Sequence, residues 1–264
     1  MSESPTPAVV VERQGSVALL VLDRPENRNS MTPELLDAFA AAVASVRHMA
    51  DVRCVVVTGR GSSFCAGADF KSGVQRTGDG RLGAERSYAM YTAFLSLLDL
   101  EVPVVGALQG HAVGGGFGLA MVCDLRIAHA SARFGANFAR LGLGSGMAIS
   151  DLLPRLIGVP RAMEMLLTGR LISGEQGAAW GLFNRAVPAD DVLPAALELA
   201  NDIAQSAPIV VRLTKRAIYQ NLGWDPRTAA WREAFGQAAT VDTEDCKEGV
   251  TALLEKRPPR FQGR

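Results

Sequence analysis

The sequence predicts an α/β protein in which a sheet-bearing first half is followed by a helical C-terminal part. Over the first half, apolar strand-like segments alternate with amphipathic helix-like segments, and this rhythm favours parallel strands joined by right-handed crossovers. After about residue 146 the pattern becomes helical. The length of 264 residues suits one large domain that buries a core without disulfides or metals.

The first half contains the strand–helix alternation. A helix is expected over residues 33–48, because Thr32 suits its N-cap and Pro33 suits its first turn. A second helix is expected near residues 86–99, and a third begins near Gly115. The expected strands are residues 8–13, 16–22, 53–58, 103–108 and 123–129.

The second half is predicted to be mainly helical. Ser173 and Gln176 have the spacing of a capping box, which begins a short helix. Thr243 suits the N-cap of the last helix, because Glu244 and Asp245 follow it at the positive end of the helix dipole. Amphipathic helices are expected near residues 190–206, 208–221, 225–240 and 243–255.

Composition and charge argue against several classes of protein. Lys plus Arg and Asp plus Glu both number 27, and this zero net charge argues against a broad basic surface for nucleic acid. The four cysteines have no paired spacing and there are three histidines, which predicts no metal site and a reducing, cytoplasmic compartment. Residues 102–123 carry no charge, but their six glycines favour a buried strand, turn and helix over a membrane span.

Two glycine-bearing segments are the candidate functional features. Residues 64–69 (FCAGAD) follow a buried strand, and residues 110–118 (GHAVGGGFG) lie between a strand and a helix. Three consecutive glycines allow a ligand to lie against the main chain, where the start of a helix presents unpaired N–H groups. A glycine-rich crossover turn without a ligand is the alternative. The P-loop and lipase nucleophile motifs are absent from the sequence, and no GxGxxG stands in the strand–turn–helix context of a dinucleotide-binding site.

Four separated motifs occur in order along the chain: LDRPENRNSMTPELL (22–36), VVVTGRGSSFCAGADF (55–70), VPVVGALQGHAVGGGFGLAMVCDLRIA (102–128) and LLEKRPPRF (253–261). Together they resemble the crotonase superfamily, also called the enoyl-CoA hydratase/isomerase family. The resemblance implies a ClpP/crotonase-like spiral of ββα units over residues 1–195. It also implies a helical trimerisation region over residues 196–264 and assembly as a homotrimer or a dimer of trimers.

The resemblance further implies how an acyl-CoA would be held. The backbone N–H groups that match Ala66 and Gly115 would bind the thioester oxygen, which gains charge when an enolate forms beside the carbonyl. Each preorganised donor stabilises such charge by roughly 3 kcal/mol. The acyl-CoA is itself the substrate or ligand, and no metal or redox cofactor is implied.

Other residues are expected around the CoA moiety. Arg28 and Lys256 match basic positions that often meet the CoA phosphates in the family, and ordinary solvated charge is the alternative for both. Asp69 also suits a turn or a cap. The loop that matches the adenine-binding segment comprises Ala66, Gly67, Ala68 and Asp69.

Three positions depart from the acid/base pattern that the resemblance implies. Gly118 and Phe138 stand where the two glutamates are expected, and Gly146 stands where some members carry an aspartate. None of these side chains can move a proton, and one positioned acid or base contributes about 10²–10⁴-fold to a rate. The sequence therefore argues against ordinary hydration. Phe138 also makes its part of the pocket drier, which suits a long or bulky acyl group.

Another side chain could take the acid/base role. Asp151 lies shortly after the glycine-rich loop and is the substitute candidate, with a helix-start role as the alternative. Further polar candidates, each with an ordinary structural interpretation beside it, are Glu85, Tyr88, Tyr91, His111, Asn137, Arg140 and Ser145.

Three functional hypotheses follow. The first is a crotonase-type lyase or isomerase, of fatty-acid or other acyl-CoA metabolism, with altered acid/base residues that acts through an enolate. The second is a non-catalytic acyl-CoA carrier or sensor. The third is a structural subunit with a vestigial site, which the intact FCAGAD and GGG segments disfavour. Fold alone does not decide among them, because function depends on the site.

Overall fold

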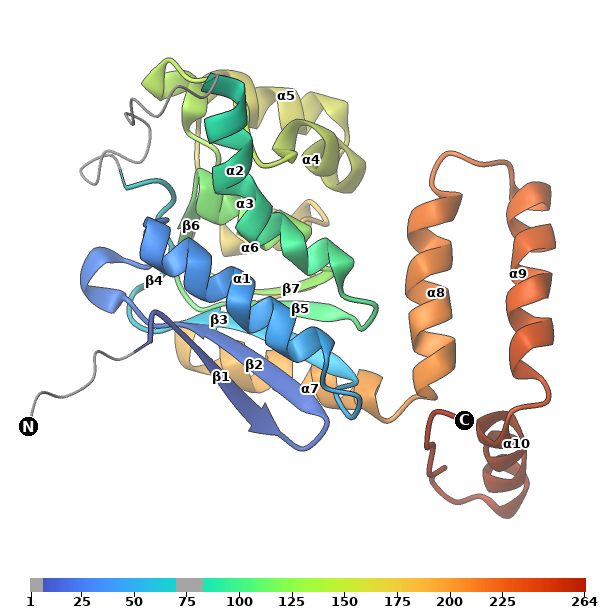
Figure 1. The fold of residues 1–264 in the computed structure, drawn as a ribbon. Helices are drawn as coiled ribbons and strands as arrows, with labels where there is room; N and C mark the ends of the chain where they lie inside the picture. Colours follow the sequence, from blue (N-terminus) through green and yellow to red (C-terminus); the bar gives the residue numbers. More distant parts are fainter. Residues whose placement is uncertain (1–6, 70–82) are drawn as a thin grey trace, which may run out of the picture.

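The computed structural model describes residues 7–69 and 83–264. Figure 1 shows a twisted sheet with helices on both of its faces, and a pair of long helices that stands beside this core. The predicted α/β class with a helical C-terminal part is confirmed.

The larger of two sheets has six strands in the order β1-β2-β3-β5-β7-β10. The first pair is antiparallel, and the other neighbours are parallel, as the strand–helix alternation predicted. Five of the strands lie within a residue or two of the expected segments. The strands are Val9–Gln14 (β1), Val17–Leu22 (β2), Cys54–Gly59 (β3), Val104–Leu108 (β5), Leu125–His129 (β7) and Arg185–Val187 (β10).

A second sheet of four short strands, in the order β4-β6-β8-β9, is a feature that the sequence pattern did not predict. Each strand has only two or three residues, which is too short for an alternation of apolar and polar residues to be recognised. The strands are Ser63–Cys65 (β4), His111–Val113 (β6), Arg133–Gly135 (β8) and Ile172–Ser173 (β9). This sheet carries both glycine-bearing segments, because the first begins within β4 and β6 lies within the second.

Strand β2 is buried along its whole length and separates two apolar cores. Its even-numbered residues Ala18, Leu20 and Leu22 pack with helix α1 (Pro33–Arg47), while the odd-numbered residues face helix α7 (Val192–Ala204). Alternate side chains of a strand point to opposite faces, so a continuous apolar run is what a sheet covered on both sides requires.

Helix α7 approaches the sheet closely through Ala196, Ala200 and Ala204, which are small residues four apart on one face. The expected division between residues 195 and 196 falls within this helix, and α7 packs against β3, β5 and β7. The part of the chain that covers the sheet therefore extends to the end of α7. The trimerisation role of the following helices stays a prediction.

Short helices complete the core. The expected helix near residues 86–99 is α2 (Gly83–Leu95), continued by a 3₁₀ turn at Ser96–Asp99. Helix α3 (Gly115–Val122) begins where predicted and is entirely buried. The Ser173 hydroxyl accepts a hydrogen bond from the Gln176 N–H at 3.1 Å, which confirms the predicted cap. The remaining helices of this part are α4 (Ile149–Ile157), α5 (Val159–Thr168) and α6 (Gly174–Ala179).

The last three helices are α8 (Pro208–Asn221), α9 (Pro226–Thr240) and α10 (Glu244–Glu255), close to their predicted ranges. Figure 1 shows α8 and α9 as an antiparallel hairpin beside the core, with α10 folded beneath it. The hairpin is tied to the core at Asp124. That carboxylate lies 2.8 Å from the Lys215 ammonium and accepts a hydrogen bond from the Tyr219 hydroxyl group at 2.7 Å.

All four cysteines are free thiols, in agreement with their unpaired spacing. Cys54, Cys65 and Cys123 are buried, and burial raises the pKa of each thiol to about 12. Cys246, on α10, is half-buried. In the described part of the chain, no helix is long and apolar enough to cross a membrane.

Candidate active site

A cavity of about 770 Å³ lies where the first glycine segment, the start of α3, helix α2 and the segment after β8 meet. Its wall combines main-chain atoms of the glycine segments with apolar side chains, among them Met31, Met90, Phe138, Leu141 and Leu143. No aspartate or glutamate of residues 7–69 and 83–264 lines it. Within the same ranges, no group of three His, Cys, Asp or Glu side chains could hold a metal ion.

The two glycine segments lie against each other at Gly67. Its φ of +86° is a conformation that favours glycine. A Cβ on Gly67 would overlap the Val113 carbonyl oxygen, at 2.5 Å, and would lie 3.2 Å from the Gly115 nitrogen. The close approach of the two main chains therefore requires glycine at this position.

The start of α3 is also packed so tightly that only glycine fits. A Cβ on Gly115 would overlap the Met31 sulfur, and a Cβ on Gly116 would overlap the Cys65 carbonyl oxygen. The glycines thus bring the N-terminus of α3 onto β4 and to the wall of the cavity. The first N–H groups of a helix have no partner within the helix, so Gly115 presents a donor there.

The prediction that the Ala66 N–H binds the thioester oxygen is wrong. The Ala66 N–H donates to the Arg28 carbonyl oxygen at 3.1 Å, so it is not available to a ligand. Ala68, two residues further on, lines the cavity, and its N–H makes no hydrogen bond to another described residue. Ala68 and Gly115 therefore both line the cavity, and neither main-chain N–H group has a hydrogen-bond partner among the described residues.

Arg28 acts through its main chain in this structure. It has a left-handed backbone with φ of 61°, is exposed, and holds the first glycine segment through its carbonyl group. Asp69 follows Ala68 and is half-buried. A contact of either side chain with CoA stays a prediction.

The three positions without a carboxylate have different surroundings. Gly118 faces Met147, which is completely buried. Phe138 lines the cavity, as predicted, and its ring edge lies 3.5 Å from the Cβ position of Gly114. A Cβ on Gly146 would overlap the hydroxyl oxygen of Tyr91, another residue that lines the cavity.

The substitute candidate Asp151 does not reach this site. It is exposed on α4, pairs with Arg155 one turn later at 2.7 Å, and is not among the residues that line the cavity. The helix-start interpretation therefore fits better than an acid/base role. Sequence reasoning named Tyr91 as a candidate, but no sequence signal showed that it lies against Gly146.

Lys256 lies far from the cavity of its own chain. It is an exposed residue at the end of α10, at the opposite end of the molecule from α2 and α5 in Figure 1. Lys256 is not among the residues that line the cavity, and a contact of its side chain with CoA stays a prediction.

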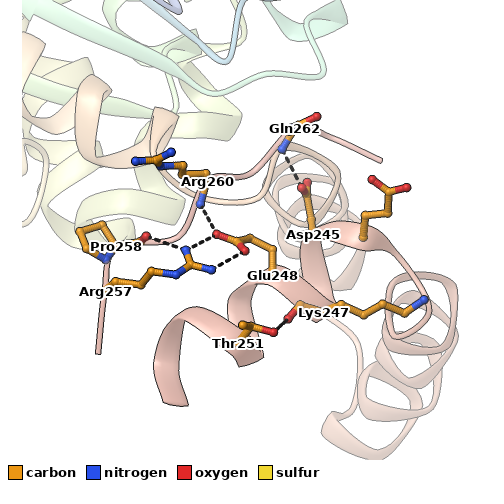
Figure 2. A pocket seen from close by; sticks show the side chains of 9 residues that line it. Asp245, Lys247, Glu248, Thr251, Arg257, Pro258, Arg260 and Gln262 are labelled. Atoms are coloured by element: carbon orange, nitrogen blue, oxygen red, sulfur yellow. Dashed lines mark hydrogen bonds and ion pairs between the residues drawn. The ribbon is translucent and has the colours of Figure 1, made fainter. Parts of the chain in front are cut away.

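A hollow of about 710 Å³ lies beside α10, and the residues that line it hold the C-terminal tail in place (Figure 2). Arg257 donates two hydrogen bonds to the Glu248 carboxylate, at 2.6 and 2.8 Å, and the Arg260 N–H donates a third at 2.8 Å. The hydrogen bonds from Arg257 contribute most to lowering the pKa of Glu248 to about 2. The Asp245 carboxylate accepts hydrogen bonds from the N–H groups of Gln262 and the next residue. Both carboxylates therefore stabilise the folded C-terminal tail.

Comparison with known proteins identifies the family and the fold. The family model for enoyl-CoA hydratase/isomerase matches residues 12–264. The short-chain-enoyl-CoA hydratase of Clostridium acetobutylicum is 35% identical over 257 residues, covering 94% of this chain and 95% of that protein. The crotonyl-CoA hydratase of Syntrophomonas wolfei is 33% identical over 259 residues, covering 96% and 97%.

A crystal structure of an enoyl-CoA hydratase from Bacillus anthracis has the same fold, with a TM-score of 0.92 and 34% identity. The match covers 97% of this chain and 100% of the Bacillus anthracis chain. The protein therefore belongs to the enoyl-CoA hydratase/isomerase family and has the crotonase fold. This confirms the family and the ββα core expected from the four motifs.

Proposed function

We propose that this protein is an acyl-CoA enzyme of the lyase or isomerase kind, and that it does not catalyse ordinary hydration. The observation that carries the proposal is the composition of the cavity wall. It presents the main-chain N–H groups of Ala68 and Gly115, while no described carboxylate lines it. Two fixed donors stabilise an enolate oxygen, whereas adding water needs a group that removes its proton.

The cavity also suits the acyl part of the substrate. Phe138, Leu141 and Leu143 replace polar surroundings with apolar contacts, which favour a long or bulky acyl group over an attacking water molecule. The place of the reaction in fatty-acid or other acyl-CoA metabolism follows from the substrate class.

We also propose that the protein assembles as a homotrimer or a dimer of trimers. The last helices expose large apolar side chains, which on a monomer would face water. Light scattering is expected to give the mass of three or six chains. In such an assembly Lys256 would meet the CoA held by a neighbouring copy. The apolar residues, 60–78% exposed, are Ile218, Trp231, Phe235, Leu253 and Leu254.

Calorimetric titration with acyl-CoAs of increasing chain length tests the function. The same samples are analysed by mass spectrometry for a change of mass and by chromatography for isomers. Binding with conversion supports the enzyme, and the mass change identifies the class of reaction. Binding with neither change would instead support the carrier or sensor, and no binding at any chain length would contradict both.

A further inference from the structure

Tyr91 occupies the place that a side chain on residue 146 would need. It lies on α2, is half-buried and lines the cavity. A Cβ on Gly146 would overlap the Tyr91 hydroxyl oxygen and would lie 2.9 Å from the ring carbon that carries it. The phenol thus stands where a carboxylate on residue 146 would enter the site.

Tyr91 differs from the other hydroxyl-bearing side chains of the cavity wall. Tyr88 is 63% exposed, and Ser87 and Ser145 are also exposed, so bulk water competes for their hydroxyl groups. The Tyr91 hydroxyl is held between α2 and the segment before α4, and it makes no hydrogen bond to another described residue. Its proton is therefore available to a bound ligand.

A phenol is chemically suited to the step in which an enolate is protonated. A phenol keeps its proton at neutral pH and can donate it, whereas a carboxylate is ionised and mainly accepts. A wall with two oxyanion donors and a phenol can therefore stabilise an enolate and then protonate its carbon.

We propose that Tyr91 is the proton donor to the carbon beside the thioester carbonyl, an inference that rests on the proposed enolate function. The O–H bond of Tyr91 breaks and a C–H bond forms at that carbon with the electron pair of the enolate double bond. The carbonyl group re-forms, and the phenolate regains a proton from water. In the reverse direction the phenolate removes the same hydrogen.

Hydrogen exchange tests this role without knowledge of the natural substrate. The probe is phenylacetyl-CoA in D₂O, because its exchangeable hydrogens lie between a phenyl ring and the thioester. Mass spectrometry follows deuterium uptake, and calorimetry follows binding of the same probe. The wild-type protein is expected to accelerate exchange, and Tyr91→Phe to lower the rate by about 100-fold or more with affinity within threefold. Tyr219→Phe removes a phenol outside the cavity and is expected to exchange at the wild-type rate.

A second variant separates chemistry from folding. Tyr91→Ala combined with Gly146→Asp places a carboxylate in the vacated space, and Gly146 has no positive φ that would forbid a side chain. Exchange is expected to recover at least tenfold over Tyr91→Ala alone, with a pH profile that reaches its plateau at lower pH, because a carboxylate ionises at lower pH than a phenol.

Two results overturn the proposal. One is wild-type exchange by a Tyr91→Phe protein that binds the probe, and the other is no exchange by a wild-type protein that binds it. Failure of the wild-type protein to bind phenylacetyl-CoA or any acyl-CoA of the chain-length series is a different outcome. It contradicts the proposed function, and the role of Tyr91 falls with it.

Discussion

Gly118 on α3 lies directly against Met147, the last residue but one before α4. A Cβ on Gly118 would overlap the Cβ of Met147 and would lie 2.8 Å from its Cγ. Met147 is completely buried and has a left-handed backbone with φ of 57°. The space that a glutamate on residue 118 would need is therefore filled by a neighbour held in an unusual conformation.

Placing a carboxylate at residue 118 without another change is expected to destabilise the fold. Gly118→Glu should lower the free energy of unfolding by at least about 3 kcal/mol, because it combines overlap with an unpaired buried charge. Adding Met147→Gly removes the overlap, and glycine suits the left-handed backbone at residue 147. The double variant should therefore lose less free energy of unfolding than the two single variants lose in sum. Urea unfolding of the four proteins of this cycle measures the coupling. Strict additivity would show that the two positions do not share space.

Phe138 is expected to contribute to binding of the acyl group. Phe138→Ala should weaken binding of phenylacetyl-CoA by roughly 5–30-fold, since losing the contact of one ring costs about 1–2 kcal/mol. Free CoA should bind the variant and the wild-type protein equally, because it has no acyl group. Calorimetry with both ligands checks this, and equal losses for both would place Phe138 at the CoA portion.

Lys215 is expected to hold α8 on the core. Its ammonium donates to the carbonyl oxygens of Leu100 and Val102 at 2.9 Å and pairs with Asp124, with both charged side chains about 15% exposed. Lys215→Met should lower the free energy of unfolding by about 3 kcal/mol, because it leaves a largely buried carboxylate without its cation.

The matched control is Arg216→Met on the same helix. Arg216 lies 3.7 Å from Glu101 and both side chains are more than half exposed, so this change should cost less than about 0.5 kcal/mol. Urea unfolding gives both values, and equal costs would mean that the Lys215 pair contributes no more than a surface ion pair.

Glu248 makes the anchor of the C-terminal tail sensitive to acid. Its pKa is about 2 in the folded protein, against an ordinary value of 4.5, so its contribution to stability is complete above about pH 4.5 and is lost as the pH falls towards 2. Glu248→Gln should therefore be less stable than the wild-type protein at pH 7, with a difference that shrinks below pH 4.5. Urea midpoints between pH 7 and pH 3 measure it. A difference that does not change with pH would exclude the ionised carboxylate as its source.

The main sheet and most helices could be predicted because their signals are local. Alternation, helical periodicity and the caps at Thr32, Ser173 and Thr243 all act within a few residues. No local signal shows that the N–H of Ala68, rather than that of Ala66, is free at the cavity. Which N–H faces the cavity depends on the turn at Gly67 and on the Arg28 carbonyl, which lies 38 residues earlier in the sequence than Ala66.

Contacts distant in sequence decide the rest of the site. Tyr91 meets Gly146, and Met147 meets Gly118, across separations that no periodic pattern encodes. The position of Lys256 depends on how the last three helices leave the core, which is a property of tertiary packing. Motifs could therefore indicate which segments form the site, but not which atoms face the ligand.

The burial of three of the four cysteines means that the native chain can be labelled selectively. Thiolates are the species that react with alkylating reagents, and a pKa of about 12 leaves Cys54, Cys65 and Cys123 almost entirely protonated at neutral pH. A fluorescent maleimide should thus attach first at Cys246. The slower modification of the other three would then measure the rate of local opening of β3, of β4 at the start of the first glycine segment, and of the end of α3.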